Sequence, residues 1–358
     1  MSEVNKNETV KKDPSKNDII LDIKHLKKYY PIQKGFFRKT VGHVKAVDDV
    51  SLYVRRGETL GLVGESGCGK TTLGKCIVRL HQPTSGEMHY KFGDGEFSDL
   101  LQLNKKESFN ARKEIQMVFQ DPYSSLNPTK TILTSFDEPM KVHGMGNPAE
   151  RKEKIAHLLE CVNLRPEYMY RYPHEFSGGQ RQRICIARAL CVNPKMVVCD
   201  EPVSALDVSI QAQVLNLMKD LQDVMGLTYV FIAHDLSVVE YMSDRIAVMY
   251  LGNIVELAES KQLYYHSEHP YTEALLSAVP IPEIGRKKDR IVLEGDVPSP
   301  ANPPTGCRFH PRCRKCMDIC KKEAPILQPL KSNPDHFVAC HLADTINTPS
   351  GVAADPKK

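Results

Sequence analysis

The 358-residue sequence lacks three features that would each place it in a broad class of protein. No run of about 18 apolar residues is present, which argues against a membrane-spanning helix. The first 18 residues mix four Lys with four acidic residues and have no apolar stretch, unlike a secretory signal. The net charge of +4 is too small an excess to require a nucleic-acid partner. We therefore expect a chain that stays in the cytosol.

What is present is the composition of a folded protein. Hydrophobic residues make up 41% and charged residues 26%, and the length suits two domains or one large domain with an appendage. Residues 1–18 are polar, so we expect them to be disordered, with order beginning near Ile19. Residues 343–358 are predicted to be a flexible tail.

Strand-like runs alternate with helical patterns along the chain, which predicts an α/β fold with a largely parallel, buried sheet. The expected strands are at 59–63, 114–119, 195–200, 227–234 and 244–256. Helical periodicity occurs at 150–164, 179–191 and 210–226.

A phosphate-binding loop is predicted by GESGCGKT at 64–71, between a buried strand and a helix. Its glycines let backbone N–H groups point inward, and the following helix adds its positive end. Lys70 is expected to reach the terminal phosphates, and the Thr71 hydroxyl to bind Mg²⁺. The residues expected to contact the nucleotide are Gly64, Glu65, Ser66, Gly67, Cys68, Gly69, Lys70, Thr71 and Thr72.

Two carboxylates end the strand predicted at 195–200. Asp200 is expected to hold Mg²⁺, and Glu201, one residue further, to polarise the attacking water as a general base.

The segment FSGGQRQR at 176–183 resembles the signature of the ABC-transporter ATPase family. Ser177 can cap a helix, and the glycines after it permit close backbone approach, so the helix start forms a second anion site. The resemblance implies that two cassettes pair head to tail around ATP. The signature residues are Ser177, Gly178, Gly179 and Gln180.

The family resemblance also implies a fold and further site residues. The fold is a P-loop NTPase (RecA-like) core over 19–262 with an inserted α-helical subdomain at about 121–193, followed by a small cysteine-rich C-terminal extension over 263–342. By position, Gln120 matches the glutamine that contacts Mg²⁺ and water, and His234 the histidine that contacts the γ-phosphate. The implied adenine-stacking ring is Tyr30 or its neighbour Tyr29, and the implied D-loop is Ser204, Ala205, Leu206 and Asp207.

Within this family the chain is similar to the ATPase subunits of oligopeptide and dipeptide importers. The similar stretches are VKAVDDVSL, HEFSGGQRQRI, SALDVSIQAQVLNLM and GCRFHPRC. The insertion at 31–44 and the Gln180-Arg181 pair resemble the second, F-type, ATPase of such importers.

This resemblance implies a place in a larger complex. The implied partners are a second ABC ATPase, two permeases and, indirectly, an extracellular or periplasmic substrate-binding protein, with no nucleic acid. The implied location is peripheral, at the cytoplasmic face of the membrane. The transported peptide, and pairing with a different ATPase rather than a second copy, stay open.

The sequence disfavours two other functions. A soluble ABC ATPase acting on nucleic acid or ribosomes is disfavoured, because the chain has one phosphate-binding loop and only 57 positions from Gln120 to Ser177. A non-catalytic cassette would have lost motif residues. All of them are present: Lys70, Gln120, Ser177, Asp200, Glu201 and His234.

Clustered cysteines follow a Pro-rich stretch at 297–304, which predicts a semi-rigid connection to a separate segment. Residues 305–341 carry a net charge of +4 and five of the 11 cysteines. Four thiolates can bind zinc or an iron–sulfur cluster, and the spacing decides neither. The resemblance favours a [4Fe–4S] cluster on Cys307, Cys313, Cys320 and Cys340. Packing of reduced cysteines and the role of Cys316 stay open.

Overall fold

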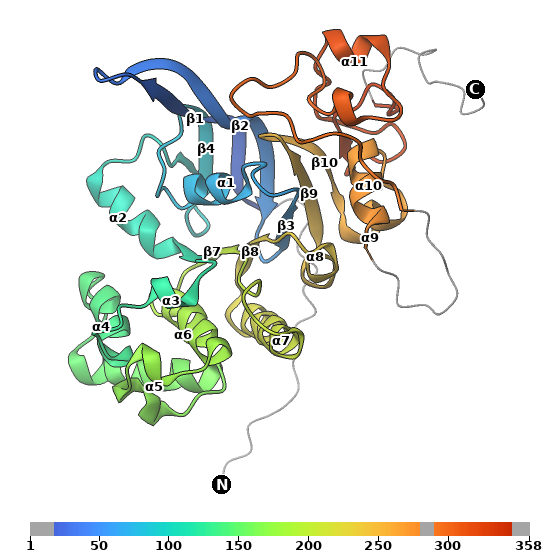
Figure 1. Cartoon of the computed structure of the whole chain (residues 1–358). Coiled ribbons are helices and arrows are strands. Elements are labelled where there is room, and N and C mark those ends of the chain that lie inside the picture. The colour runs from blue at the N-terminus through green and yellow to red at the C-terminus, as the bar shows by residue number, and fades with distance from the viewer. Residues whose placement is uncertain (1–17, 280–289, 346–358) are drawn as a thin grey trace, which may run out of the picture.

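The computed structural model describes residues 18–279 and 290–345. The disorder predicted for 1–18 and the tail predicted for 343–358 fall almost wholly outside these residues. Two sheets and a set of helices are arranged in layers, with the cysteine-rich segment at one end of the larger sheet (Figure 1).

The larger sheet has eight strands and confirms the expected α/β fold. β9, β3, β8, β7 and β6 pair in parallel, and the remaining strands add to one edge in antiparallel fashion. In spatial order the strands are β11 (Gln328–Pro329), β12 (Phe337–Val338), β10 (Asn253–Glu259), β9 (Arg245–Tyr250), β3 (Thr59–Val63), β8 (Thr228–Ile232), β7 (Met196–Asp200) and β6 (Ile115–Val118).

The single strand predicted at 244–256 is wrong. The chain reverses at Leu251 and Gly252, both with positive φ (44° and 85°), and returns as β10 antiparallel to β9. Gly252-Asn253 interrupts the apolar residues at this turn and is a hairpin signal that the single-strand prediction overlooked, because both strands are buried and neither alternates with polar residues.

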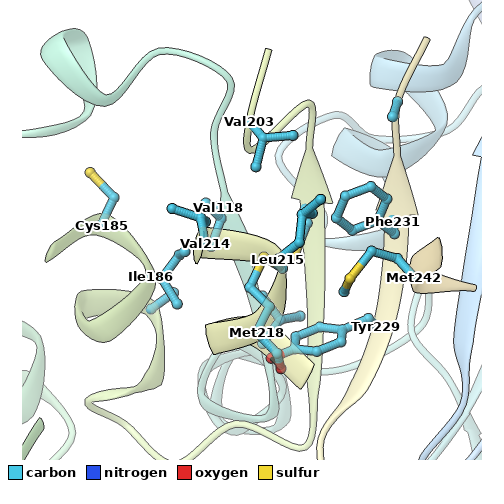
Figure 2. Packing of buried hydrophobic residues seen from close by; sticks show 14 of the residues in the cluster. Val118, Cys185, Ile186, Val203, Val214, Leu215, Met218, Tyr229, Phe231 and Met242 are labelled. Atoms are coloured by element: carbon cyan, nitrogen blue, oxygen red, sulfur yellow. Dashed lines mark hydrogen bonds between the residues drawn. The ribbon is translucent and has the colours of Figure 1, made fainter. Parts of the chain in front are cut away.

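A smaller antiparallel sheet covers one face of the larger one. Its strands, in spatial order, are β2 (Lys39–Arg55), β1 (Ile19–Lys34), β4 (Ser85–Lys91) and β5 (Phe97–Asp99). Alternation along β7 shows the layering. Met196 and Val198 belong to the core shared with β1 and β2, whereas Val197 and Cys199 belong to the core shared with the helices. Figure 2 shows part of this second core, including Tyr229 and Phe231 of β8.

Helices follow the strands as the periodicity predicts. The described helices are α1 (Lys70–Ile77), α2 (Lys105–Glu114), α3 (Pro122–Ser125), α4 (Ile132–Val142), α5 (Pro148–Cys161), α6 (Gly178–Leu190), α7 (Val208–Met225), α8 (Leu236–Met242), α9 (Ser260–Tyr265), α10 (Pro270–Ser277) and α11 (Asp318–Lys322), with short 3-10 helices at Pro166–Tyr170, Pro173–Glu175 and His310–Arg312. The three predicted helices correspond to α5, α6 and α7, and α7 ends at Gly226, whose φ is 66°.

The cysteine-rich segment is not the separate appendage that the Pro-rich stretch predicts. Its β12 pairs with β10, and the amide of Lys45 donates to the carbonyl of Pro300 inside the Pro-rich stretch itself (3.0 Å). Nε2 of His336 lies 2.7 Å from Oε1 of the fully buried Glu256 in β10. The side chain of Phe309 is also buried, 5.3 Å between ring centroids from Tyr250. The segment therefore shares the core of the larger sheet.

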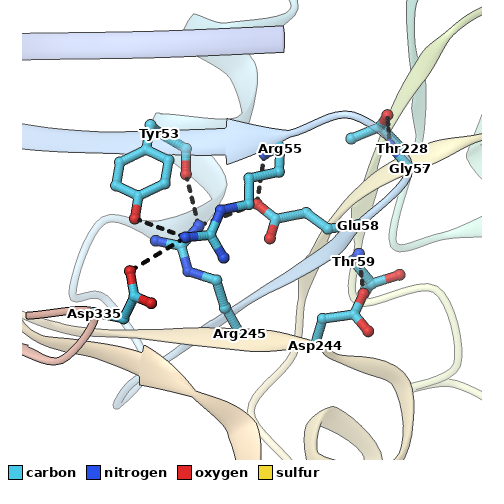
Figure 3. A network of polar contacts seen from close by, with 9 residues as sticks. All are labelled: Tyr53, Arg55, Gly57, Glu58, Thr59, Thr228, Asp244, Arg245 and Asp335. Carbon is cyan, nitrogen blue, oxygen red and sulfur yellow. Dashed lines mark hydrogen bonds and ion pairs between the residues drawn. The ribbon is translucent and has the colours of Figure 1, made fainter. Parts of the chain in front are cut away.

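A buried ion pair joins the start of β3 to the start of β9 (Figure 3). Glu58 and Arg245 lie 3.1 Å apart, with side chains only 2% and 4% exposed. Burial raises the pKa of Glu58, and the positive charge of Arg245 opposes that shift. The guanidinium also stacks on the ring of Tyr53, 4.1 Å from its centroid.

We predict that Glu58→Gln lowers the free energy of unfolding by about 3–5 kcal/mol, because it leaves the Arg245 charge buried and unpaired. Urea denaturation measures this loss. Glu138→Gln, which removes an exposed pair with Lys130, is the matched control and should cost much less. The double variant Glu58→Gln/Arg245→Met should regain part of the loss, and equal effects of the two single Glu variants would contradict the prediction.

Candidate functional site

The loop between β3 and α1 can be built only with glycine at its turns. Gly64, Gly67 and Gly69 have φ of 150°, 77° and 108°, in the region that side chains disfavour. A Cβ on Gly64 would lie 2.1 Å from the carbonyl oxygen of Met249, and one on Gly69 would lie 2.0 Å from that of Ala46. The loop thus has the tight, open-backbone form that cradles phosphate.

Lys70 lies folded over this loop. Its Nζ donates to the carbonyl oxygens of Gly64 (2.7 Å) and Glu65 (3.0 Å), and the residue is buried. Because Gly69 at the N-cap of α1 has no side chain, the first N–H groups of the helix stay available to an anion. Lys70 and the N-terminal end of α1 therefore both lie at the loop where a phosphate would bind.

Two side-chain oxygens meet beside the loop, one from the start of α1 and one from the end of β7. Oγ1 of Thr71 donates to Oδ1 of Asp200 at 2.8 Å, and Asp200 is buried. Burial raises the pKa of Asp200, and the hydrogen bond from Thr71 lowers it. A hydroxyl and a carboxylate in contact are the kind of ligand pair that Mg²⁺ takes next to a phosphate.

Glu201 is the meeting point of three strand ends. Its Oε2 accepts a hydrogen bond from Nε2 of Gln120 (2.8 Å), and Nδ1 of His234 lies 3.3 Å from the same oxygen. The backbone of Glu201 has φ of 46°, and its N–H donates to the carbonyl of Ile232 at the end of β8 (2.9 Å). Three residues predicted separately from sequence thus lie in one cluster.

Tyr30 of β1 lies beside α1, where burial raises the pKa of its hydroxyl and the side chain of Thr72 opposes that shift. Tyr29 instead donates to Asp48, and Lys45 lies over its ring at 5.8 Å from the centroid. Of the two candidates for the stacking ring, Tyr30 is the one beside α1.

The signature residues lie beside the predicted D-loop. Ser177 caps α6 and accepts a hydrogen bond from the amide of Gln180 (3.3 Å). A Cβ on Gly179 would lie 2.5 Å from Ile210 in α7, and one on Gly178 would contact Leu206 of the D-loop. The structure groups this motif with the D-loop, and the phosphate loop with Asp200 and Thr71.

Arg312 contacts the predicted phosphate-binding loop, a contact that the sequence did not reveal. Its two Nη atoms donate to the two carboxylate oxygens of Glu65 in the loop (2.7 and 3.1 Å), and this contact raises the pKa of Arg312. The hydroxyl of Tyr271 in α10 accepts from the amide of Glu65 (2.9 Å). No local pattern signals a pair separated by 247 positions. The cysteine-rich segment therefore contacts the phosphate-binding loop.

The four predicted thiol ligands gather in one region. Burial is the main reason that the pKa of Cys340 rises to about 12, and proximity to Cys307, Cys313 and Cys320 adds to the rise. Cys316 interacts with Cys313 and Cys320. Among residues 18–279 and 290–345, however, no three His, Cys, Asp or Glu side chains are arranged to hold a metal ion. The thiols lie near one another without forming a ready ligand set.

Two family models match the chain. The model described as ABC transporter matches residues 47–204, and the one described as oligopeptide/dipeptide transporter, C-terminal region, matches residues 255–320. A solved structure, the dimeric post-hydrolysis state of the ATP-binding cassette MJ0796 bound to ADP and Pi, is similar with a TM-score of 0.58 and 28% identity, over 67% of this chain and 99% of that one. The fold and site thus define an ABC ATPase, an enzyme that hydrolyses ATP.

Curated relatives narrow this class. The chain is 54% identical over 327 residues to the oligopeptide transport ATP-binding protein AppF of Bacillus subtilis, covering 91% of this chain and 98% of the relative. It is 49% identical over 328 residues to the dipeptide transport ATP-binding protein DppF of Haemophilus influenzae, covering 92% and 98%. The chain therefore belongs to the ATP-binding subunits of the oligopeptide/dipeptide ABC transporter family. Within the described residues, no helix has the length and apolarity to cross a membrane.

We predict that Arg312→Gln weakens ATP binding roughly fivefold, because the unpaired Glu65 carboxylate then repels the phosphates. Titration with a fluorescent ATP analogue measures this, and kcat at saturating ATP should change less. Arg314→Gln, an exposed arginine on the same segment, is the matched control.

The double variant Glu65→Gln/Arg312→Gln should bind ATP more tightly than Arg312→Gln alone, since it removes the repelling charge. Equal affinity of the single and double variants would show that Arg312 does not act through Glu65.

Proposed function

We propose that this ATPase powers the import of peptides through two partner permeases, as a peripheral subunit at the cytoplasmic face of the membrane. The observation that carries the proposal is the cluster at Glu201 beside the phosphate loop, in a chain whose relatives are named as peptide transport ATP-binding proteins. The permeases and a substrate-binding protein are the partners that such a transporter needs. The match of residues 255–320 to a peptide-transporter model disfavours a role on nucleic acid or ribosomes.

ATP is proposed to lie with its terminal phosphates on Lys70 and the loop, and with its adenine on Tyr30. When bound, Mg²⁺ would neutralise charge on the phosphates, with Thr71, Gln120 and Asp200 as the residues that hold it. The hydrogen bond between Thr71 and Asp200 supports these ligands for Mg²⁺, because it already holds the hydroxyl and carboxylate oxygens side by side.

Glu201 is proposed as the general base and His234 as the contact to the γ-phosphate. A cavity of about 50 Å³ beside them is lined by Glu201, His234 and Asp235, among others, which is room for a water molecule with polar partners. Gln120 donates to Oε2 of Glu201, which orients the carboxylate. A carboxylate so placed can take a proton from water as the oxygen attacks phosphorus.

The signature residues are proposed to complete the ATP site of a partner cassette. They lie beside the predicted D-loop, and the similar cassette MJ0796 was solved as a dimer. We propose that the partner is a second, different ABC ATPase and that this chain is the F-type member.

The helices from α3 to α6 are proposed to form the inserted helical subdomain at about 121–193. Their place in the chain between β6 and β7 supports this.

We propose residues 263–342 as the C-terminal extension. They overlap residues 255–320, which match the model described as oligopeptide/dipeptide transporter, C-terminal region.

A [4Fe–4S] cluster, with zinc as the alternative, is proposed on Cys307, Cys313, Cys320 and Cys340. The gathering of these four thiols supports it, as does the excess of Lys and Arg around them. When bound, the cluster would cross-link the segment.

We predict that Glu201→Gln keeps ATP binding but lowers the hydrolysis rate by about 10² or more, the usual contribution of a general base. Steady-state phosphate release and nucleotide titration on the assembled transporter measure the two effects. Lys70→Ala provides the contrast, since it should abolish binding itself. Near-normal turnover by Glu201→Gln would remove Glu201 from this role.

We predict that protein purified without oxygen is brown, absorbs broadly near about 400 nm and contains about four iron atoms per chain. Cys340→Ser should lose the metal, whereas Cys316→Ser should keep it. Metal analysis that finds one zinc and no iron would replace the cluster by zinc. A metal-free protein would make these cysteines packing residues.

A further inference from the structure

A two-stranded ribbon projects from the smaller sheet (Figure 1). β1 pairs with β4 over Leu21–Lys27 and with β2 along its whole length, as far as Lys34 opposite Lys39. In the described part of the chain, the outer ribbon thus pairs only with itself. The amide of Arg38 donates to the carbonyl of Gly35 (3.1 Å), which closes the turn. We call residues 34–39 the ribbon tip.

Two aromatic rings at the ribbon tip face solvent almost completely. Phe36 is 97% exposed and Phe37 is 92% exposed, and the rings touch only edge to face, with centroids 5.7 Å apart. Val41, further along β2, is also more than half exposed. Because they pack against no core, these rings do not stabilise the fold. Large apolar side chains exposed together usually mark a contact surface.

The charge around these rings is of one sign. Lys34, Arg38 and Lys39 belong to the ribbon tip, and residues 28–44 contain no Asp or Glu. At the base of the ribbon, by contrast, Lys27 pairs with Asp49 (3.6 Å) and Lys45 with Asp48 (3.8 Å). The pairing sets Lys34 directly opposite Lys39, with Arg38 beside them. Like charges that face each other across strands destabilise a ribbon, and a negatively charged surface relieves this cost.

We propose that the ribbon tip docks on the anionic surface of the lipid bilayer. Phe36 and Phe37 enter the boundary between head groups and acyl chains, and the basic residues bind lipid phosphates. Basic residues of both strands flank the two rings, and they would lie among the lipid head groups once the tip is inserted. Aromatic residues flanked by basic ones are typical of segments that bind at the membrane interface. A docked ribbon would orient the ATPase independently of its permeases, which goes beyond its role in transport.

The absence of tryptophan from the sequence allows a direct test on the full chain. Phe37→Trp places a single tryptophan at the ribbon tip. With vesicles of phosphatidylcholine and phosphatidylglycerol, its emission should shift to the blue and be quenched by lipids brominated on their acyl chains. Vesicles of phosphatidylcholine alone should give a smaller shift. Tyr265→Trp in α9, 78% exposed and outside the ribbon, is the matched control and should show neither effect.

The two kinds of contact should separate in binding measurements. In a vesicle sedimentation assay, the double variant Phe36→Ser/Phe37→Ser should show a lower affinity for vesicles, by roughly tenfold for each ring removed. Lys39→Gln should weaken it roughly fivefold, and added salt should act in the same direction. ATP binding serves as a folding control for each variant, and its loss would be a failure of the fold or of the nucleotide site.

Three results would overturn the proposal. One is a Phe37→Trp spectrum that does not respond to anionic vesicles, and another is equal binding by the chain with and without the two Phe. The third is a tip that, in the transporter assembled in lipid nanodiscs, crosslinks to a permease and escapes quenching by brominated lipid. That last result would make the ribbon a protein contact.

Discussion

The parallel register of β3, β8 and β7 is the constraint on which the site depends. Leu62 is paired with Ile232, and Ile232 with Asp200, so the three strands end at one level. The predicted phosphate loop, the Asp200 and Glu201 carboxylates and His234 lie at or just after these ends. Because neighbouring residues in a strand point to opposite faces, a slip of one residue would turn Asp200 away from Thr71. The hydrogen bond from Glu201 to the carbonyl of Ile232 extends the register past the last pair.

Much of this architecture could be predicted because its signals are local. A buried strand, a glycine motif and a helical periodicity can each be recognised within about ten residues. The strand β3, for example, lies at the predicted residues 59–63. The reversal at Leu251 and Gly252 was missed although Gly252-Asn253 is a local turn signal, because the apolar residues on both sides resemble one long buried strand. A short turn between two buried strands is thus easily taken for part of one strand.

Contacts between distant segments could not be predicted. Arg312 and Glu65 are ordinary surface residues by type, and only the fold makes one bind the other. The same holds for His336 at Glu256. A cysteine cluster and a Pro-rich stretch suggested a separable unit, yet packing of Phe309 joins this unit to the main sheet. The motif residues near Glu201 were identified by order and context, whereas their mutual contacts are known only from the structure.

The buried Glu256 has a consequence for how this chain can be recombined. Its carboxylate accepts hydrogen bonds from the amides of Glu268 (2.8 Å) and His269 (3.1 Å) and lies beside His336, so one acidic side chain is shared by three stretches of sequence. A charge of this kind cannot be left without its partners. Chimaeras that exchange C-terminal segments between relatives must therefore inherit matched residues on both sides of the junction. The same constraint applies when new subunits evolve: the cassette, with Glu256, and its extension, with His336, have to be kept together.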